Sequence, residues 1–203
     1  MKRIGVLPLL CLPALGLAQP QVEEVSYHYL EAGFVDADID VPGGEDLSGD
    51  GYGFEYSVDV RDHVHLFGAY ERFDIEDIDG DATRKLFGLG THWGLTDKLS
   101  VYGRFAYTDV ALDVGTGNVG DDGAAVMGGV RYLFDNGWEV RAGAEHVDLD
   151  DGGTETYYTV GGNLFLTDIV ALSLDVDDRD GDMVALLGLR FYWDNDPGPR
   201  RRR

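Results

Sequence analysis

The stretch GYGFEYSVDV, from Gly51 to Val60, decides the fold of this 203-residue chain. Aromatic or aliphatic side chains occupy every second position, and glycine, glutamate, serine and aspartate lie between them. Successive side chains of a β-strand point to opposite faces. The period of two therefore predicts a strand with one apolar face and one polar face.

The same alternation recurs along most of the chain. Apolar stripes without a charged residue occupy alternate positions of Phe87 to Leu95, Leu99 to Tyr107, Ala124 to Phe134, Trp138 to Ala144, Tyr158 to Leu166, Val170 to Val176 and Met183 to Trp193. Val25 to Asp36 and Val64 to Phe73 complete a set of ten predicted strands. The pattern does not decide which face of Val64 to Phe73 points outward, because Glu71 and Arg72 place one charge on each face. Most predicted strands have the length of a tilted membrane-crossing strand, which exceeds the strands usual in soluble sheets.

Charged residues gather on the face opposite the apolar stripes. This face carries Glu55, Asp59, Arg104, Arg131, Glu139, Arg141, Glu145, Asp175 and Arg190, together with many glycines. If the apolar face meets lipid, these charges line a narrow interior and form a network of buried ion pairs. A narrow path for water or ions remains an alternative. A secreted soluble β-barrel with its apolar face inward is another.

Short and long connections alternate strictly between the predicted strands. The short ones contain Arg61 to His63, Thr96 to Lys98, Asp135 to Gly137, and Thr167 with Asp168. The long ones are Asp36 to Asp50, Asp74 to Ala82, Asp109 to Asp122, Asp148 to Thr156 and Asp175 to Asp182, and they hold 24 of the 38 acidic residues. Short turns on one side and long polar loops on the other are typical of outer-membrane barrels, whose long loops are extracellular.

The three tryptophans fall at one end of the predicted barrel. Trp93 ends one strand, Trp138 begins another and Trp193 ends the last, which places all three at the short-turn end. Indole rings favour the membrane interface. Phe34, Tyr52, Phe87, Tyr107 and Tyr158 are expected to form a looser girdle toward the other end.

The two ends of the chain indicate its compartment. Lys2 and Arg3 precede an apolar run that ends in Gly16-Leu17-Ala18, a pattern typical of a secretory signal peptide over residues 1–18. The only cysteine, Cys11, lies in this segment, so the mature chain is expected to lack disulfides and thiol chemistry. Residues 19–193 are predicted to form the barrel domain. Residues 194–203 form a basic tail that ends in four arginines and is predicted to be periplasmic.

The last strand resembles a known assembly signal. The spacing Gly188-x-x-Phe191-x-Trp193 is similar to the end strands of OmpA- and OmpX-type outer-membrane barrels. The segment VSYHYLEAGF, Val25 to Phe34, resembles small barrels regulated by diffusible signal factor. The resemblance implies an all-β, up-and-down antiparallel transmembrane barrel in the cell outer membrane. Ten strands are expected, with eight as the alternative, and the outer-membrane barrel assembly machinery is an implied partner.

The sequence predicts no catalytic, cofactor-binding or metal-binding residues. The best catalytic candidate is His146 with Asp148, helped by Glu145 or Asp177, but the parity of His146 points outward. His63 and His65 could share a strand face, yet with His28 and His92 they form no complete metal-ligand spacing that we recognise. The alternative of an enzyme that acts on lipid or protein therefore ranks below a non-enzymatic role.

The acidic connections resemble calcium loops only in composition. Counting back from Gly80, Gly152 and Gly181, the first ligand position is held by Ile75, Val147 and Val176, whose side chains cannot bind a cation. Weak divalent-cation binding that bridges to lipopolysaccharide phosphates stays a hypothesis. Nucleic acid is not expected as a partner of a chain with a net charge of −22.

These features together predict a monomeric, non-enzymatic outer-membrane barrel. Its expected role is structural, envelope-maintaining or surface-interacting, with outer-membrane lipid and lipopolysaccharide as partners. A narrow ion or small-solute channel is the leading functional alternative.

Overall fold

The computed structural model describes residues 26–39, 47–75, 80–115, 117–179 and 182–193. The described residues form ten strands: β1 Tyr29–Ile39, β2 Leu47–Arg61, β3 Val64–Ile75, β4 Gly80–Gly94, β5 Leu99–Val114, β6 Gly117–Leu133, β7 Trp138–Leu149, β8 Gly153–Thr167, β9 Val170–Arg179 and β10 Asp182–Tyr192. In this part of the chain no helix is long and apolar enough to cross a membrane. The predicted signal peptide and basic tail lie outside the described residues.

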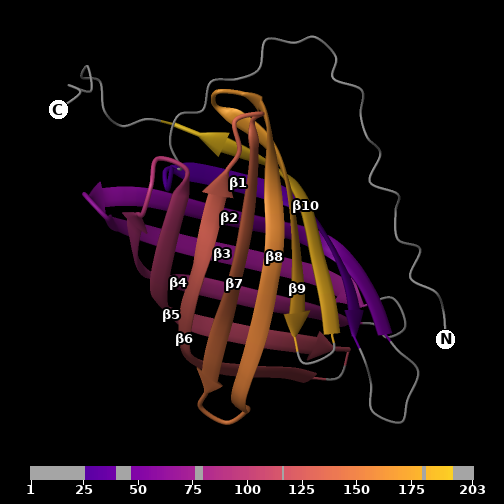
Figure 1. Cartoon of the computed structure of the whole chain (residues 1–203). Helices are drawn as coiled ribbons and strands as arrows, with labels where there is room; N and C mark the ends of the chain where they lie inside the picture. The colour runs from indigo at the N-terminus through magenta and orange to yellow at the C-terminus, as the bar shows by residue number, and fades with distance from the viewer. Residues whose placement is uncertain (1–25, 40–46, 76–79, 116, 180–181, 194–203) are drawn as a thin grey trace.

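The strands form one closed, antiparallel barrel in which each strand pairs with its sequence neighbours. β1 and β10 close the ring, with Glu31 directly opposite Arg190 and Gly33 opposite Gly188. Figure 1 shows the strands wrapped around a common axis. The prediction of a ten-stranded up-and-down barrel is confirmed, and the eight-stranded alternative is wrong. Closure leaves no unpaired strand edge to face lipid.

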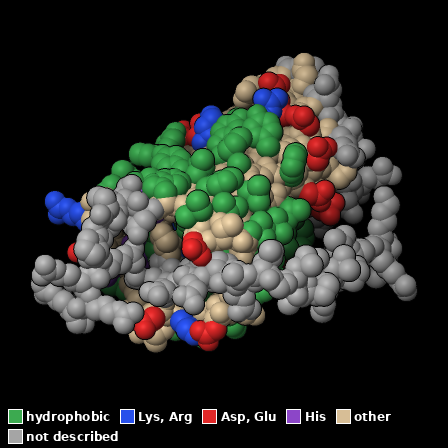
Figure 2. All heavy atoms as spheres, turned by 90° about the horizontal axis from the view of Figure 1, so that it is seen from above, with side chains coloured by type: hydrophobic (Ala, Val, Ile, Leu, Met, Phe, Trp, Pro, Cys, Tyr) green, Lys and Arg blue, Asp and Glu red, His purple; other side chains and the backbone are tan. Residues whose placement is uncertain are grey.

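The predicted apolar stripes point outward. Phe34 is 79% exposed, and Phe87, Phe105 and Val160 are each more than half exposed. Figure 2 shows hydrophobic side chains over much of the face in view, with several acidic side chains toward one end. The structure also settles the facing of β3, because His65, Phe67 and Phe73 are buried inside the barrel. Glu71 shares their face, and Arg72 points outward.

The predicted long connections are mostly strand, which corrects the sequence interpretation. β5 and β6 stay paired from Leu99 and Tyr132 to Val114 and Gly117, so the predicted loop from Asp109 to Asp122 is a hydrogen-bonded hairpin. β7 and β8 likewise pair as far as Leu149 and Gly153. Hairpin pairing satisfies the backbone polar groups whatever the side chains are. The end of the barrel that carries these hairpins is called the loop end below, and the opposite end is called the short-turn end.

Side-chain polarity reverses at the loop end. Here the inward residues are apolar, and Val35, Ala37, Phe73, Ile75 and Val184 form a buried cluster. The outward residues are acidic, and Asp36 lies opposite Asp50 just beyond the opposed aromatic pair Phe34 and Tyr52. This arrangement matches a strand extension that leaves the membrane and meets water. The sequence interpretation took the end of the apolar outward stripe for the end of the strand.

The short-turn end carries the predicted turn and tryptophans. Gly137 has a φ of 74° in the turn between β6 and β7, as expected for the Asn-Gly pair. Trp93 and Trp138 are about half exposed on the outer surface. Trp193 follows β10, and its ring lies 6.1 Å from that of His28. The predicted location of the tryptophans at one rim is therefore confirmed.

Candidate functional site in the barrel interior

Arginine and carboxylate side chains from facing walls meet inside the barrel. The inward arginines Arg84, Arg104, Arg131, Arg141, Arg179 and Arg190 each form an ion pair with an inward glutamate or aspartate. The ion-pair network expected from the alternating pattern is therefore present. Arg179 also belongs to it, although the sequence interpretation placed this residue in a loop.

One group of ion pairs lies across the seam that closes the barrel. Arg190 on β10 donates from Nε to Oε2 of Glu31 on β1 at 2.6 Å, and both side chains are 2% exposed. Ser173 on β9 donates its hydroxyl hydrogen to the other oxygen of Glu31. Arg141 on β7 binds Asp175 on β9 through two guanidinium nitrogens. The group connects β1 to β10, β9 and β7 through side chains.

Arg104 forms the centre of a second group. Its Nη1 donates to Oε1 of Glu55 at 2.9 Å, and its Nη2 donates to the Tyr29 hydroxyl at 2.8 Å. The Tyr29 hydroxyl in turn donates to Oε1 of Glu55 at 2.6 Å. The guanidinium also lies 4.6 Å from the centre of the Phe67 ring, within the range of a cation–π contact. β1, β2, β3 and β5 are thereby connected through the interior.

Arg131 and Glu139 form the most enclosed pair toward the short-turn end. Arg131 on β6 donates from Nη2 to both carboxylate oxygens of Glu139 on β7, at 2.9 and 2.8 Å. The Arg131 side chain is 3% exposed and the Glu139 side chain 1%. Asn163 on β8 donates to Glu139 at 2.9 Å and to the Tyr192 hydroxyl at 3.1 Å. Two-pronged pairing of this kind is the strong form of an arginine–carboxylate contact.

Further pairs lie toward the loop end. Arg179 on β9 donates to Glu71 on β3 at 2.9 Å and to Asp177 at 3.0 Å. Arg84 on β4 binds Glu145 on β7. Both guanidinium groups lie over the ring of Tyr157, at 5.3 and 5.4 Å from its centre. Together with the apolar cluster at this end, these contacts place side chains from β3, β4, β7, β8 and β9 in the interior.

The space left between the charged groups is small. A cavity of about 140 Å³ lies among Glu55, Glu71, Arg84, Arg104 and Arg141. Pockets for small organic ligands are usually about 300 to 1,000 Å³. The interior therefore has room for water among the ion pairs, and its volume falls short of a typical ligand pocket.

The structure places His146 and Asp148 on the outer face of β7, apart from the two helpers that the sequence suggested. His146 points outward, as its parity predicts, and its Nδ1 lies 3.1 Å from the Thr156 hydroxyl. Glu145 and Asp177 point inward, where they bind Arg84 and Arg179. The two helpers therefore lie on the other side of the sheet from His146. Ile75 and Val147, which hold the first ligand position in two of the calcium-like segments, are buried inside the barrel.

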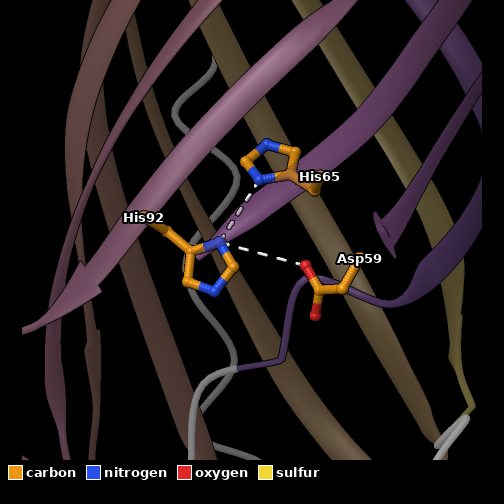
Figure 3. A group of neighbouring side chains, drawn as sticks. All are labelled: Asp59, His65 and His92. Atoms are coloured by element: carbon orange, nitrogen blue, oxygen red, sulfur yellow. Dashed lines mark hydrogen bonds and ion pairs between the residues drawn. The ribbon is translucent and has the colours of Figure 1, made fainter. Parts of the chain in front are cut away.

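Four of the chain's five histidines gather at the short-turn end, which the sequence interpretation missed. Asp59, His65 and His92 come from β2, β3 and β4 and point toward one another (Figure 3). His28 lies 3.3 Å from Asp59, and the ring of His63 is 5.9 Å from that of His92. The available signal was the proximity of Asp59 and His65 on either side of a short turn. A register shift between Asp59 and Arg61 places the two residues directly opposite each other.

A family model of the outer membrane protein beta-barrel domain matches residues 7–164 of the sequence. The chain belongs to this family. The protein is therefore a barrel of the cell outer membrane, as the sequence predicted. No curated protein matches the sequence.

Three solved outer-membrane proteins match this chain at low sequence identity. The KdgM porin, solved in complex with disordered oligogalacturonate, is 12% identical with a TM-score of 0.49, and the match covers 82% of this chain and 99% of that one. OprG from Pseudomonas aeruginosa is 10% identical with a TM-score of 0.45, covering 85% and 99%. Ail, the attachment invasion locus protein of Yersinia pestis, is 12% identical with a TM-score of 0.42, covering 81% and 97%.

Proposed function

We propose that this outer-membrane barrel is a closed, non-enzymatic structural protein whose loop end interacts with the cell-surface environment. The observation that supports the proposal best is the charged interior, in which all six described inward arginines form ion pairs with inward carboxylates. Breaking such pairs to open a path leaves buried charges uncompensated, which is costly. Passage of large solutes is therefore not expected.

Planar-bilayer recording tests the closed interior. Purified protein in a lipid bilayer is expected to give no steady conductance steps of porin size, whereas a general porin in the same bilayer supplies the positive control. Steady porin-size steps would overturn the proposal. Small, ion-selective steps would favour the narrow-channel alternative, for which the cavity beside Arg104 and Glu55 is the supporting observation.

The surface role rests on a row of aspartates at the loop end. Asp36, Asp50, Asp74, Asp81 and Asp113 lie directly opposite one another across β1 to β5. Like charges in opposed positions destabilise a sheet unless something compensates them. Arg72 compensates part of this charge, because its Nη2 lies 3.2 Å from Oδ1 of Asp81 and its Nε lies 3.9 Å from Oδ1 of Asp74. We propose that divalent cations compensate the remaining charge and bridge it to lipopolysaccharide phosphates.

Thermal unfolding in the presence of calcium tests the surface role. Millimolar calcium is expected to raise the unfolding temperature of the folded protein in lipopolysaccharide-containing vesicles. The double variant Asp50→Asn/Asp74→Asn should show a smaller calcium-induced rise in unfolding temperature. Asp135→Asn, at the opposite end of the barrel, should show the same rise as wild type. A thermal transition that does not respond to calcium or to a chelator would count against the bridging role.

A further inference from the structure

The pairing of three neighbouring strands brings Asp59, His65 and His92 to one point inside the short-turn end. Asp59 on β2 lies directly opposite His65 on β3. The backbone N–H of His92 on β4 donates to the carbonyl oxygen of His63 at 3.0 Å, which fixes β4 beside the same turn. Figure 3 shows both imidazole rings and the carboxylate directed toward a common space. The pairing register of β2, β3 and β4 therefore determines the arrangement of Asp59, His65 and His92.

The separations within this group suit a metal ion. Nδ1 of His65 lies 3.3 Å from Nδ1 of His92, and Nδ1 of His92 lies 3.9 Å from Oδ1 of Asp59. One ligand atom from each residue lies within 4.8 Å of the other two. Zinc bonds to nitrogen and oxygen of about 2.0 to 2.2 Å, arranged tetrahedrally, place the ligand atoms roughly 3.3 to 3.6 Å apart. Small side-chain movements would therefore bring all three atoms into a coordination shell.

An unsatisfied oxygen points to a missing partner. Oδ1 of Asp59 is buried and has no hydrogen-bond partner among the described residues. Its other oxygen, Oδ2, lies 3.3 Å from Nδ1 of His28. A buried carboxylate oxygen without a donor is costly, and a bound cation removes that cost. The carboxylate is thus held by His28 on one side and directed at the two imidazoles on the other.

The surrounding residues fix the two rings in place. The ring of Tyr27 stacks on His92 at 4.0 Å between centres with an 8° interplanar angle, and lies 5.0 Å from that of His65. The Tyr27 hydroxyl is held by Ser100 at 2.9 Å. Gly90 leaves the space that His65 occupies, because a Cβ there would lie 2.1 Å from Nε2 of His65. Ligands held in this way lose little conformational freedom when a metal binds.

We propose that Asp59, His65 and His92 form a binding site for a divalent first-row transition-metal ion, with Zn²⁺ as the representative ion. Two imidazoles and one carboxylate suit such ions, whereas calcium and magnesium prefer oxygen ligands. Three protein ligands leave a fourth position for water or for the nearby ring of His63. The side chains of His92 and Asp59 are 16% and 29% exposed, so an ion can enter from the short-turn end. The site is independent of whether the barrel conducts.

The hydrogen bond from Arg104 to His65 makes binding of a metal ion less favourable. Its Nε donates to Nε2 of His65 at 3.3 Å, so the neutral imidazole carries its proton on Nδ1. Coordination through Nδ1 requires the proton to move to Nε2, which breaks this contact with Arg104. Arg104 keeps its shorter bonds to Glu55 and Tyr29. The guanidinium charges of Arg104, bonded to His65, and of Arg131, 4.5 Å from the centre of the Tyr27 ring, also oppose a cation, so they are expected to lower the affinity for the metal ion.

Calorimetric titration of the folded, tag-free protein with Zn²⁺ tests the site. Chelator-treated wild type is expected to bind one equivalent, and Co²⁺ is expected to give the visible absorption of a tetrahedral nitrogen and oxygen site. His92→Gln and Asp59→Asn should each weaken Zn²⁺ binding at least tenfold. His146→Gln, which removes the histidine on the outer surface, should bind as wild type does.

Heat-modifiable gel migration establishes that each variant is folded before titration. If His92→Gln does not fold, Asp59→Asn and the Co²⁺ spectrum of wild type decide the question. The proposal is overturned if wild type shows no saturable Zn²⁺ binding, if folded Asp59→Asn binds as wild type does, or if His146→Gln abolishes binding.

Discussion

Replacement of Arg131 by methionine tests the energetic role of the interior ion pairs. The substitution removes three hydrogen bonds from the guanidinium to Glu139, and among the described residues the amide of Asn163 is then the remaining donor to that carboxylate. The Glu139 side chain is 1% exposed, so bulk water cannot replace the lost bonds without rearrangement. Loss of one partner of a buried pair typically costs about 3 to 5 kcal/mol.

A second substitution separates charge pairing from simple loss of packing. In Arg131→Met/Glu139→Gln the uncompensated charge is gone, and the side-chain carbonyl introduced at position 139 can still accept from Asn163. The remaining loss should then be near that of ordinary hydrogen bonds, about 1 to 2 kcal/mol, so the double variant is expected to recover roughly 2 to 3 kcal/mol.

Reversible urea unfolding in lipid vesicles, followed by tryptophan fluorescence, measures these free energies. Lys98→Met provides a surface control, because Lys98 and its partner Asp135 are well exposed and such pairs contribute little. Stability of Arg131→Met within about 1 kcal/mol of wild type would refute the reasoning. A double variant as unstable as the single variant would refute it as well.

Three further predictions concern the glycine under His65, the tryptophan rim and the basic tail. Gly90→Ala should displace the ring of His65, because its Cβ would lie 2.1 and 2.4 Å from two ring atoms, and should therefore weaken Zn²⁺ binding in calorimetry. Gly117→Ala is the matched control, because no atom of the described residues lies within 4 Å of the new Cβ. Trp93 and Trp138 should be quenched most strongly by spin labels at headgroup depth, and stronger quenching by labels near the bilayer centre would contradict the interfacial placement. Deletion of Pro199 to Arg203 should reduce retention on peptidoglycan if the arginines bind anionic surfaces; unchanged pull-down and assembly yield would leave the tail without that role.

The barrel itself could be predicted from the sequence because membrane strands alternate strictly between lipid and interior. Apolar stripes such as Tyr52 to Val60 predict the strands and their facing, and the acidic and basic residues on the opposite faces of the whole set predict the ion pairs. The loop end could not be predicted in the same way. Beyond Phe34 and Tyr52 the apolar residues change to the inward face, and a search for an outward apolar stripe ends there although the strand continues.

The histidine group was missed for a different reason. Its members come from three strands, and no spacing along one strand contains them. Counting outward from the turn at Asp62 and His63 places Val60 opposite His65. Asp59 lies opposite His65 because the register shifts between Asp59 and Arg61, and the sequence pattern did not predict this shift. The position of His92 depends on the register between β3 and β4, where Gly90 lies opposite His65. That register is fixed by pairing along the whole hairpin and was not specified by the sequence pattern alone.

Cross-linking of the first strand to the last tests the closed ten-stranded barrel most directly. Ala32 on β1 lies opposite Leu189 on β10, and directly opposed residues have Cβ atoms about 4.5 to 5.5 Å apart, near the range that a disulfide spans. In Ala32→Cys/Leu189→Cys, oxidation of the outer-membrane fraction is expected to give an intramolecular disulfide, seen on a non-reducing gel as a faster band after boiling. Ala32→Cys/Leu174→Cys, which places the second cysteine on β9, should give little of this band. Absence of the cross-link in the β1–β10 pair, or equal yields in both pairs, would contradict a barrel closed by β1 and β10.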